Sequence, residues 1–193
     1  QKIGARKLLI YTRANPLHPM NAAEIRNDTG KTLDGGPITV FDSGTYAGEG
    51  LIETLKAGDQ RLISYGVDLG TRVTTKLDSG AAVTREVRAN RGVVTVRSAV
   101  RETNTYMARN VDAKAKTMLI EHPVRMQYKL IDVKPVETSA NYHRFEMKLP
   151  AKGEAKFAVV EEREFENTLM AVNLTPDVLL AYVQNRAISE EGR

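Results

Sequence analysis

The sequence predicts a mainly β fold: antiparallel β-sandwich units of the immunoglobulin-like kind, two in tandem, followed by a C-terminal helix. Short apolar or alternating runs are separated by Gly, Pro, Asn and Asp, which is typical of strands and turns. Almost no helical pattern lies between residues 7 and 166, whereas parallel sheets would need crossover helices. Two phrases also occur twice in the same order, as two tandem units would give.

The predicted strands follow the apolar and alternating runs. In Val93–Thr103 valines alternate with polar residues, which predicts a half-buried strand with Val94, Val96 and Val100 on its buried face. The other expected strands are Lys7–Thr12, Ala22–Asn27, Pro37–Phe41, Arg61–Val67, Thr71–Leu77, Ala82–Arg88, Tyr106–Asn110, Thr117–Glu121, Met126–Ile131, Tyr142–Leu149 and Ala155–Glu161.

The repeated phrases predict the domain organisation. "IRNDTGKTL" at 25–33 is echoed by "ARNVDAKAKTML" at 108–119, and "LKAGDQRLISY" at 55–65 by "LPAKGEAKFAVV" at 149–160. Two similar turns in any β protein would explain the same likeness. The tandem interpretation gives a first unit at 1–80, a second at 81–172, and a helical segment at 173–193 that leads to a missing part of a longer protein.

One helix is predicted near the C-terminal end. In "NLTPDVLLAYVQNRAIS" Thr175 is a suitable N-cap, Pro176 suits the first helical position and Asp177 the first turn. The apolar residues Val178, Leu179, Tyr182 and Val183 follow at helical spacing. We expect Leu179, Tyr182 and Val183 to dock on the β body or on a second copy, because so short a helix is marginal in water.

Residues 33–50, "LDGGPITVFDSGTYAGEG", contain five glycines and raise the question of a phosphate-binding loop. Such a loop leads into a helix and carries a lysine. Here Glu49 lies between Gly48 and Gly50, where a lysine would be useful. The glycines are therefore expected to serve turns between strands.

Candidate catalytic and metal-binding residues are few. The chain has no cysteine, so disulfides and thiolate sites are excluded. His122, His143 and Glu121 could meet and bind zinc if their strands were neighbours, which makes them weak metal candidates. No G-x-S-x-G elbow occurs, and "EEREFE" at 161–166 is expected to be a solvated face. We expect no cofactor and no catalytic activity.

A basic cluster surrounds one predicted hairpin and consists of Arg85, Arg88, Arg91, Arg97 and Arg101. It is interpreted as a solubilising face, with a polyanion or lipid-headgroup site as the alternative. Single-stranded nucleic acid would need aromatic stacking platforms, and no aromatic residue occurs between Tyr65 and Tyr106. The net charge of +4 is also modest. We therefore expect no nucleic-acid partner.

Four phrases resemble one bacterial family. "IRNDTGKTLDGGPITVFDSGTYAGE", "AKTMLIEHPVR", "YHRFEMKLPAKGEAKFAVVEERE" and "LLAYVQNRAIS" are together similar to the mucoidy-inhibitor-like proteins, in matching order from about residue 20 onward. Their shared region is a domain of unknown function. The resemblance implies a β-rich, sandwich-like domain in a longer envelope-associated or exported protein, with coiled-coil segments elsewhere. It brings no catalytic residues.

These observations lead to one expected function and two alternatives. The chain is expected to be a non-catalytic structural or interaction module of a larger bacterial protein, located in the periplasm, outside the cell or at the envelope. Its partner would be a protein: its own missing segment, a second copy or an envelope component. No apolar run is long enough to span a bilayer. The alternatives are a glycan-directed hydrolase acting through carboxylates, and a domain binding polyanions or lipid headgroups.

Overall fold

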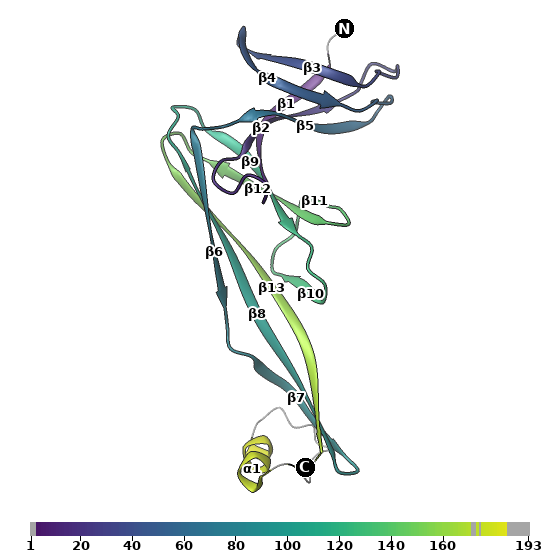
Figure 1. Ribbon diagram of the computed structural model, residues 1–193, viewed down its shortest axis with the longest axis vertical. Coiled ribbons are helices and arrows are strands. Elements are labelled where there is room, and N and C mark those ends of the chain that lie inside the picture. The colour runs from purple at the N-terminus through teal and green to yellow at the C-terminus, as the bar shows by residue number, and fades with distance from the viewer. Residues whose placement is uncertain (1–2, 171–172, 174, 185–193) are drawn as a thin grey trace. The chain divides into compact units, whose positions relative to one another are not determined.

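The computed structural model describes residues 3–170, 173 and 175–184 (Figure 1). The predicted mainly β fold with one short C-terminal helix is confirmed. The strands are β1 (Gly4–Tyr11), β2 (Met20–Arg26), β3 (Gly36–Asp42), β4 (Thr45–Ile52), β5 (Gln60–Val67), β6 (Thr71–Ser79), β7 (Val83–Asn90), β8 (Val93–Asn110), β9 (Lys116–Pro123), β10 (Tyr128–Ile131), β11 (Glu137–Thr138), β12 (Tyr142–Leu149) and β13 (Glu154–Met170), and the helix is α1 (Pro176–Gln184).

The chain forms two compact units, each assembled from separate segments. The first unit comprises Gln1–Thr75, Tyr106–Val124 and Lys134–Phe157, and the second comprises Lys76–Thr105, Arg125–Val133 and Ala158–Arg193. Strands β6, β8 and β13 contribute residues to both units. These units differ from the sequential division into 1–80 and 81–172, because strands from both halves of the chain share one sheet.

That sheet belongs to the first unit and has the order β11-β12-β9-β1-β2-β5. Its strand pairs are antiparallel, as the sequence predicts, with one exception. Strand β1 pairs in parallel with β9, so that Leu9 lies opposite Met118. Strand β1 therefore has a neighbour on each side, and its last four residues, Leu8–Tyr11, are buried.

A second layer packs on this sheet and makes the first unit a sandwich. Tyr11 of β1 contacts Tyr106 of β8 edge to face, with ring centroids 5.9 Å apart. Phe145 of β12 lies 5.3 Å from Phe157 of β13, again between centroids. Such aromatic pairs contribute beyond the area they bury. One part of the core therefore lies between the six-stranded sheet and the adjacent ends of β8 and β13, and a second buried cluster of Leu8, Ile10, Ala22 and Leu119 lies on the other face of the sheet.

The glycine-rich stretch forms the β3–β4 hairpin, and its glycines serve two purposes. Gly44 lies in the turn with a φ of 81°, as a tight turn requires. Gly48 and Gly50 instead lie within β4, where the hairpin packs closely on β5. A Cβ at Gly48 would overlap the carbonyl oxygen of Tyr65. The stretch leads from strand to strand and not into a helix, and the prediction of turn glycines holds for Gly44 but not for Gly48 or Gly50.

The first copy of the repeated phrase folds around a buried asparagine, Asn27. Its side-chain amide donates to the carbonyl oxygens of Lys31 (2.7 Å) and Leu55 (2.9 Å). Its side-chain oxygen accepts a hydrogen bond from the backbone N–H of Thr29 at 3.1 Å. One side chain thus closes its own loop and attaches it to the second phrase, which begins at Leu55.

The second copy repeats these contacts around Asn110. The amide donates to the carbonyl oxygens of Lys114 and Pro150, each at 2.9 Å, and the side-chain oxygen accepts from the N–H of Asp112 at 3.1 Å. The offsets of two and four residues match those around Asn27. Both asparagines are at most 1% exposed. The two repeated phrases are therefore similar in structure as well as in sequence.

The second unit contains β7, β10 and the remaining parts of β6, β8 and β13. Its described strands belong to one sheet with the order β10-β13-β8-β6, and β7 pairs with β8. The predicted alternation along β8 is confirmed for Val94 and Val96, which are each 5% exposed, whereas Val100 is only partly buried. Strands β7 and β8 are joined at Arg91 and Gly92, which both have a positive φ.

Helix α1 begins at Pro176, as the capping pattern predicts. The side chains of Leu179, Tyr182 and Val183 lie outside the described part of the structure, so their docking stays a prediction. The expected continuation of the helix beyond Gln184 lies outside the described residues as well. In the described part of the chain, no helix combines the length and the apolar character needed to cross a membrane.

Candidate functional site

The first unit contains a cavity of about 530 Å³. This volume lies within the range of small-molecule sites, about 300–1,000 Å³. Its walls come from β1, β2, the beginning of β9 and two loops. The lining residues are Lys7, Leu8, Leu9, Asn21, Asp68, Asp112, Ala113, Lys114, Ala115, Lys116 and Thr117. The cavity thus combines an apolar wall with several convergent charges.

An ion-pair network fixes one side of this cavity. The ammonium group of Lys116 lies 2.7 Å from carboxylate oxygens of both Asp68 and Asp112, and it donates to the hydroxyl of Thr71 at 3.1 Å. The side chains of Lys116 and Asp68 are only 16% and 10% exposed. Because its ammonium group bridges two carboxylates, Lys116 holds the two loops together.

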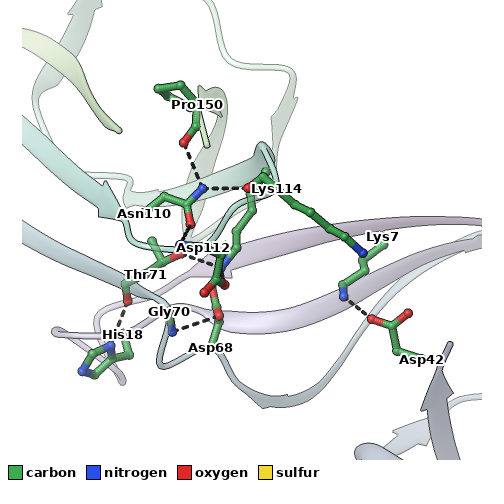
Figure 2. A network of polar contacts seen from close by, with 11 residues as sticks. Lys7, His18, Asp42, Asp68, Gly70, Thr71, Asn110, Asp112, Lys114 and Pro150 are labelled. Carbon is green, nitrogen blue, oxygen red and sulfur yellow. Dashed lines mark hydrogen bonds and ion pairs between the residues drawn. The ribbon is translucent and has the colours of Figure 1, made fainter. Parts of the chain in front are cut away.

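The loop around Asp68 is held by further local contacts (Figure 2). Asp68 Oδ1 accepts from the N–H of Gly70 at 3.2 Å, and His18 Nδ1 lies 2.8 Å from the carbonyl oxygen of Thr71. A Cβ on Gly70 would overlap the carboxylate of Asp112. A side chain at position 70 would therefore require the half-exposed carboxylate of Asp112 to move away from its place beside the cavity.

The mouth of the cavity carries two more lysines. Lys7 is paired with Asp42, which comes from the turn of the β3–β4 hairpin. Figure 2 shows the side chain of Lys114 extending towards Lys7. Lys114 is exposed and has no ion-pair partner among the described residues. The hydrogen bond from Lys7, helped by the charge of Lys114, lowers the pKa of Asp42. Asp42 is therefore the ion-pair partner of Lys7, and Lys114 acts on this carboxylate only through its charge.

The signal for this site lies inside the repeated phrase. In "DAKAK" at 112–116, charged residues alternate with alanine, so the charged side chains tend to share one face of an extended chain. The partners Lys7 and Asp68 are distant in the sequence and carry no comparable pattern. The cavity was therefore not predicted.

A second candidate surface lies on the β3–β4 hairpin. One face packs on β5, and the other, here called the outer hairpin face, consists of Pro37, Thr39, Phe41, Tyr46, Glu49 and Leu51. Phe41, Tyr46 and Leu51 are 64%, 58% and 73% exposed. The two aromatic rings meet edge to face, 6.2 Å apart between centroids. A shallow groove of about 420 Å³ crosses the hairpin between Pro37 and Leu51.

The predicted metal candidates are only partly brought together. Strands β9 and β12 are neighbours, and His143 lies opposite His122. His122 is buried, and its Nδ1 lies 2.7 Å from the hydroxyl of Tyr106. Glu121 instead accepts from the guanidinium of Arg144 at 2.8 Å, and adjacent strand residues point to opposite faces. Among the described residues, no group of three or more His, Cys, Asp or Glu side chains is placed to hold a metal ion.

Most arginines of the predicted polyanion patch are engaged by glutamates. Arg85 and Arg101 both pair with Glu162, at 3.0 and 2.5 Å. Arg97 pairs with Glu166 at 3.0 Å. In the same way Arg88 pairs with Glu86 at 2.6 Å, and Arg91 has no ion-pair partner in the described part of the chain. The acidic run "EEREFE" therefore neutralises much of the cluster.

A third charged network, in the second unit, was missed by sequence reasoning. The guanidinium of Arg125 lies between Glu161 at 2.6 Å and Glu102 at 2.5 Å, and it stacks 3.7 Å from the ring centroid of Tyr128. The Tyr128 hydroxyl also donates to Glu102 at 2.8 Å. These bonds lower the pKa of Glu102. The residues come from three strands and one loop that are distant in the sequence, so no local pattern predicts their contact.

These sites are assigned from their geometry alone. No family model, curated protein or solved structure matches this chain.

Proposed function

We propose that this chain is a non-catalytic interaction module of a larger bacterial, exported or envelope-associated protein, and that it binds a protein partner through the outer hairpin face. The observation that carries the proposal is the exposure of Phe41, Tyr46 and Leu51 on one face of a single hairpin. Exposed apolar residues gathered on one surface mark interaction sites. Aromatic side chains are also the residues that most often carry binding energy.

The backbone supports this role by holding the hairpin firmly. Gly48 lets β4 approach β5 so closely that a Cβ there would overlap the carbonyl oxygen of Tyr65, and a Cβ at Gly50 would lie 3.0 Å from the nearest atoms of Ile63 and Ser64. The outer hairpin face is therefore presented with little freedom of movement, which lowers the entropic cost of binding.

The charge of the hairpin supports a choice of partner. Residues 36–52 contain Asp42 and Glu49 and no Lys, Arg or His, and because Asp42 is paired with Lys7, Glu49 is the charged residue that the outer hairpin face presents. Complementary charge favours a basic partner, and the exposed aromatic rings favour apolar side chains within it. The proposed partner is therefore a protein segment that combines basic and apolar residues.

Within the described residues, no contact favours the glycan-hydrolase alternative. A general acid needs a carboxyl group whose pKa is raised. In "EEREFE" the hydrogen bond from Arg101, followed by that from Arg85, lowers the pKa of Glu162. Glu161 is likewise bound to Arg125. These carboxylates hold arginines in place.

Site-specific photocrosslinking of the full-length protein in its own host tests the proposal. Leu51 is replaced by p-benzoylphenylalanine, and the matched control carries it at Met126, which is 92% exposed in the second unit. We expect position 51 alone to capture one predominant protein, through a segment rich in Lys or Arg and apolar residues. Adding Phe41→Ser and Tyr46→Ser should abolish that product without changing the thermal unfolding midpoint.

Three outcomes would contradict the proposal. Equal yields at positions 51 and 126 would show that the hairpin is not a preferred contact. Capture of an acidic segment would reject the charge argument. A crosslink between two copies of this chain would replace the heterologous partner by self-association.

A further inference from the structure

We infer that the cavity of the first unit binds a small acid, a carboxylate carried on a short apolar group, with the carboxylate held between Lys7 and Lys114. This inference concerns a different surface from the outer hairpin face and is independent of the proposed function. It rests on the balance of charge in the cavity, on its apolar wall, and on a carboxylate that the protein itself places at the mouth.

The three lysines and three aspartates around the cavity balance in number, but they are not evenly paired. Lys116 is paired with both Asp68 and Asp112, each 2.7 Å away. Lys7 is paired with Asp42, and Lys114 has no ion-pair partner in the described part of the chain. An arriving anion therefore meets attraction between these two lysines, and it meets carboxylates further inside. This arrangement favours a ligand with one negative charge at one end.

The wall next to these lysines is apolar. Leu9 lies on the same face of β1 as Lys7 and lines the cavity together with Ala113 and Ala115, whereas the side chain of Leu8 belongs to the core cluster with Ile10 and Leu119 on the other face. With about 530 Å³ available, an aliphatic group of several carbons fits beside them. Its transfer from water contributes about 0.8 kcal/mol for each buried CH₂.

The contact of Asp42 with Lys7 indicates the kind of anion that the mouth of the cavity accommodates. The turn of the β3–β4 hairpin places its carboxylate on Lys7, where the inferred ligand would bind. Ser43 donates to the same carboxylate at 3.3 Å, and Ser43 and Gly44 both adopt a positive φ. The Lys7–Asp42 pair is 58% and 45% exposed, and exposed pairs contribute little. A ligand carboxylate can therefore take the place of Asp42.

Titration of the full chain with sodium hexanoate, followed by ¹H–¹⁵N NMR, tests the inference. We expect shift changes at Lys7–Leu9 and at residues 112–117. Hexanamide has the same apolar group without the charge, and inorganic phosphate has charge without the apolar group. Because the lysines are exposed, hexanoate should bind about three- to fivefold more tightly than either control. N-acetylleucine, titrated alongside, distinguishes the C-terminal end of a peptide from an aliphatic acid as the source of the carboxylate.

Variants separate the roles of the charged groups. Lys114→Ala should weaken hexanoate binding about threefold, and Asp42→Asn should strengthen it by a similar factor. Lys129→Ala, an exposed lysine of the second unit, is the matched control and should have no effect. Equal affinities for hexanoate and hexanamide, phosphate binding as tight as that of hexanoate, or an unchanged affinity in Lys114→Ala would each overturn the inference.

Discussion

At the scale of single residues, Asn27 and Asn110 make the same set of hydrogen bonds at two places in the chain. Each buried amide donates to two carbonyl oxygens, and each side-chain oxygen accepts from a backbone N–H two residues later. An asparagine side chain has two donor hydrogens and one acceptor oxygen. Most of the capacity of both side chains is therefore used inside the protein.

Removing either asparagine side chain should be costly. Asn27→Ala removes the hydrogen bonds to the carbonyl oxygens of Lys31 and Leu55 and the one from the N–H of Thr29, and each such bond contributes about 0.5–1.5 kcal/mol. We expect urea unfolding to show a loss of about 2–4 kcal/mol, with a similar loss for Asn110→Ala. Asn141→Ala, at an exposed position, should change the free energy of unfolding by no more than about 0.5 kcal/mol. Losses below 1 kcal/mol in both buried variants would contradict this account.

Sequence reasoning succeeded at this scale only where the signal was repeated. The phrase that contains Asn27 occurs again around Asn110, so both loops could be located in advance. The contacts of Arg125 with Glu161 and Glu102, and of Lys7 with Asp42, join residues that no short pattern connects. Such contacts depend on the strand order, which the sequence does not reveal locally.

At the scale of elements, the packing of the β3–β4 hairpin on β5 depends on the absence of a side chain at Gly48. Gly48→Ala would place a methyl group on the carbonyl oxygen of Tyr65, and the residue also has a φ of 139°. Gly44 has a φ of 81°, but a Cβ there meets nothing within 4 Å. We therefore expect Gly48→Ala to cost about 3 kcal/mol or more, and Gly44→Ala about 1 kcal/mol.

Thermal unfolding and hydrogen exchange of residues 36–52 measure this difference. Faster exchange confined to the hairpin in Gly48→Ala would show that the hairpin has detached from β5. If the two alanine variants melted at the same temperature, close packing would not be the reason for glycine at position 48.

The elements themselves were the most predictable part of the fold. Turn residues and alternating runs indicate strands because those patterns act over a few neighbours. Gly48 and Gly50 were interpreted as turn residues for the same reason, since the sequence does not show that another strand passes within contact distance. Their place inside β4 follows from tertiary packing.

At the scale of the whole molecule, the first unit depends on strands from both halves of the chain. Strands β1, β2 and β5 come from the first 80 residues, whereas β9 and β12 come from the second half. We expect a fragment of residues 1–80 to remain unfolded, because β1 then lacks one neighbour and the apolar surface around Leu9 and Tyr11 has no cover. A dispersed ¹H–¹⁵N spectrum of this fragment, compared with that of the full chain, would contradict the expectation.

The sequential division was a natural prediction because the repeated phrases suggest two successive units. The parallel pairing of β1 with β9 has no local signal, since no helix connects the two strands directly. The fold class could thus be predicted from short-range patterns, whereas the assembly of strands into units could not.

The pairing of β1 with β9 also determines when β1 can complete its sheet during synthesis of the chain. Leu9 and its partner Met118 are 118 − 9 = 109 residues apart. Ribosomes add about 5–20 residues per second, so roughly 5–20 s pass between the synthesis of the two. During that interval β2 can already pair with one edge of β1, while the other edge is open to strands of neighbouring nascent chains. The risk of aggregation for this protein is therefore concentrated in the seconds before β9 leaves the ribosome.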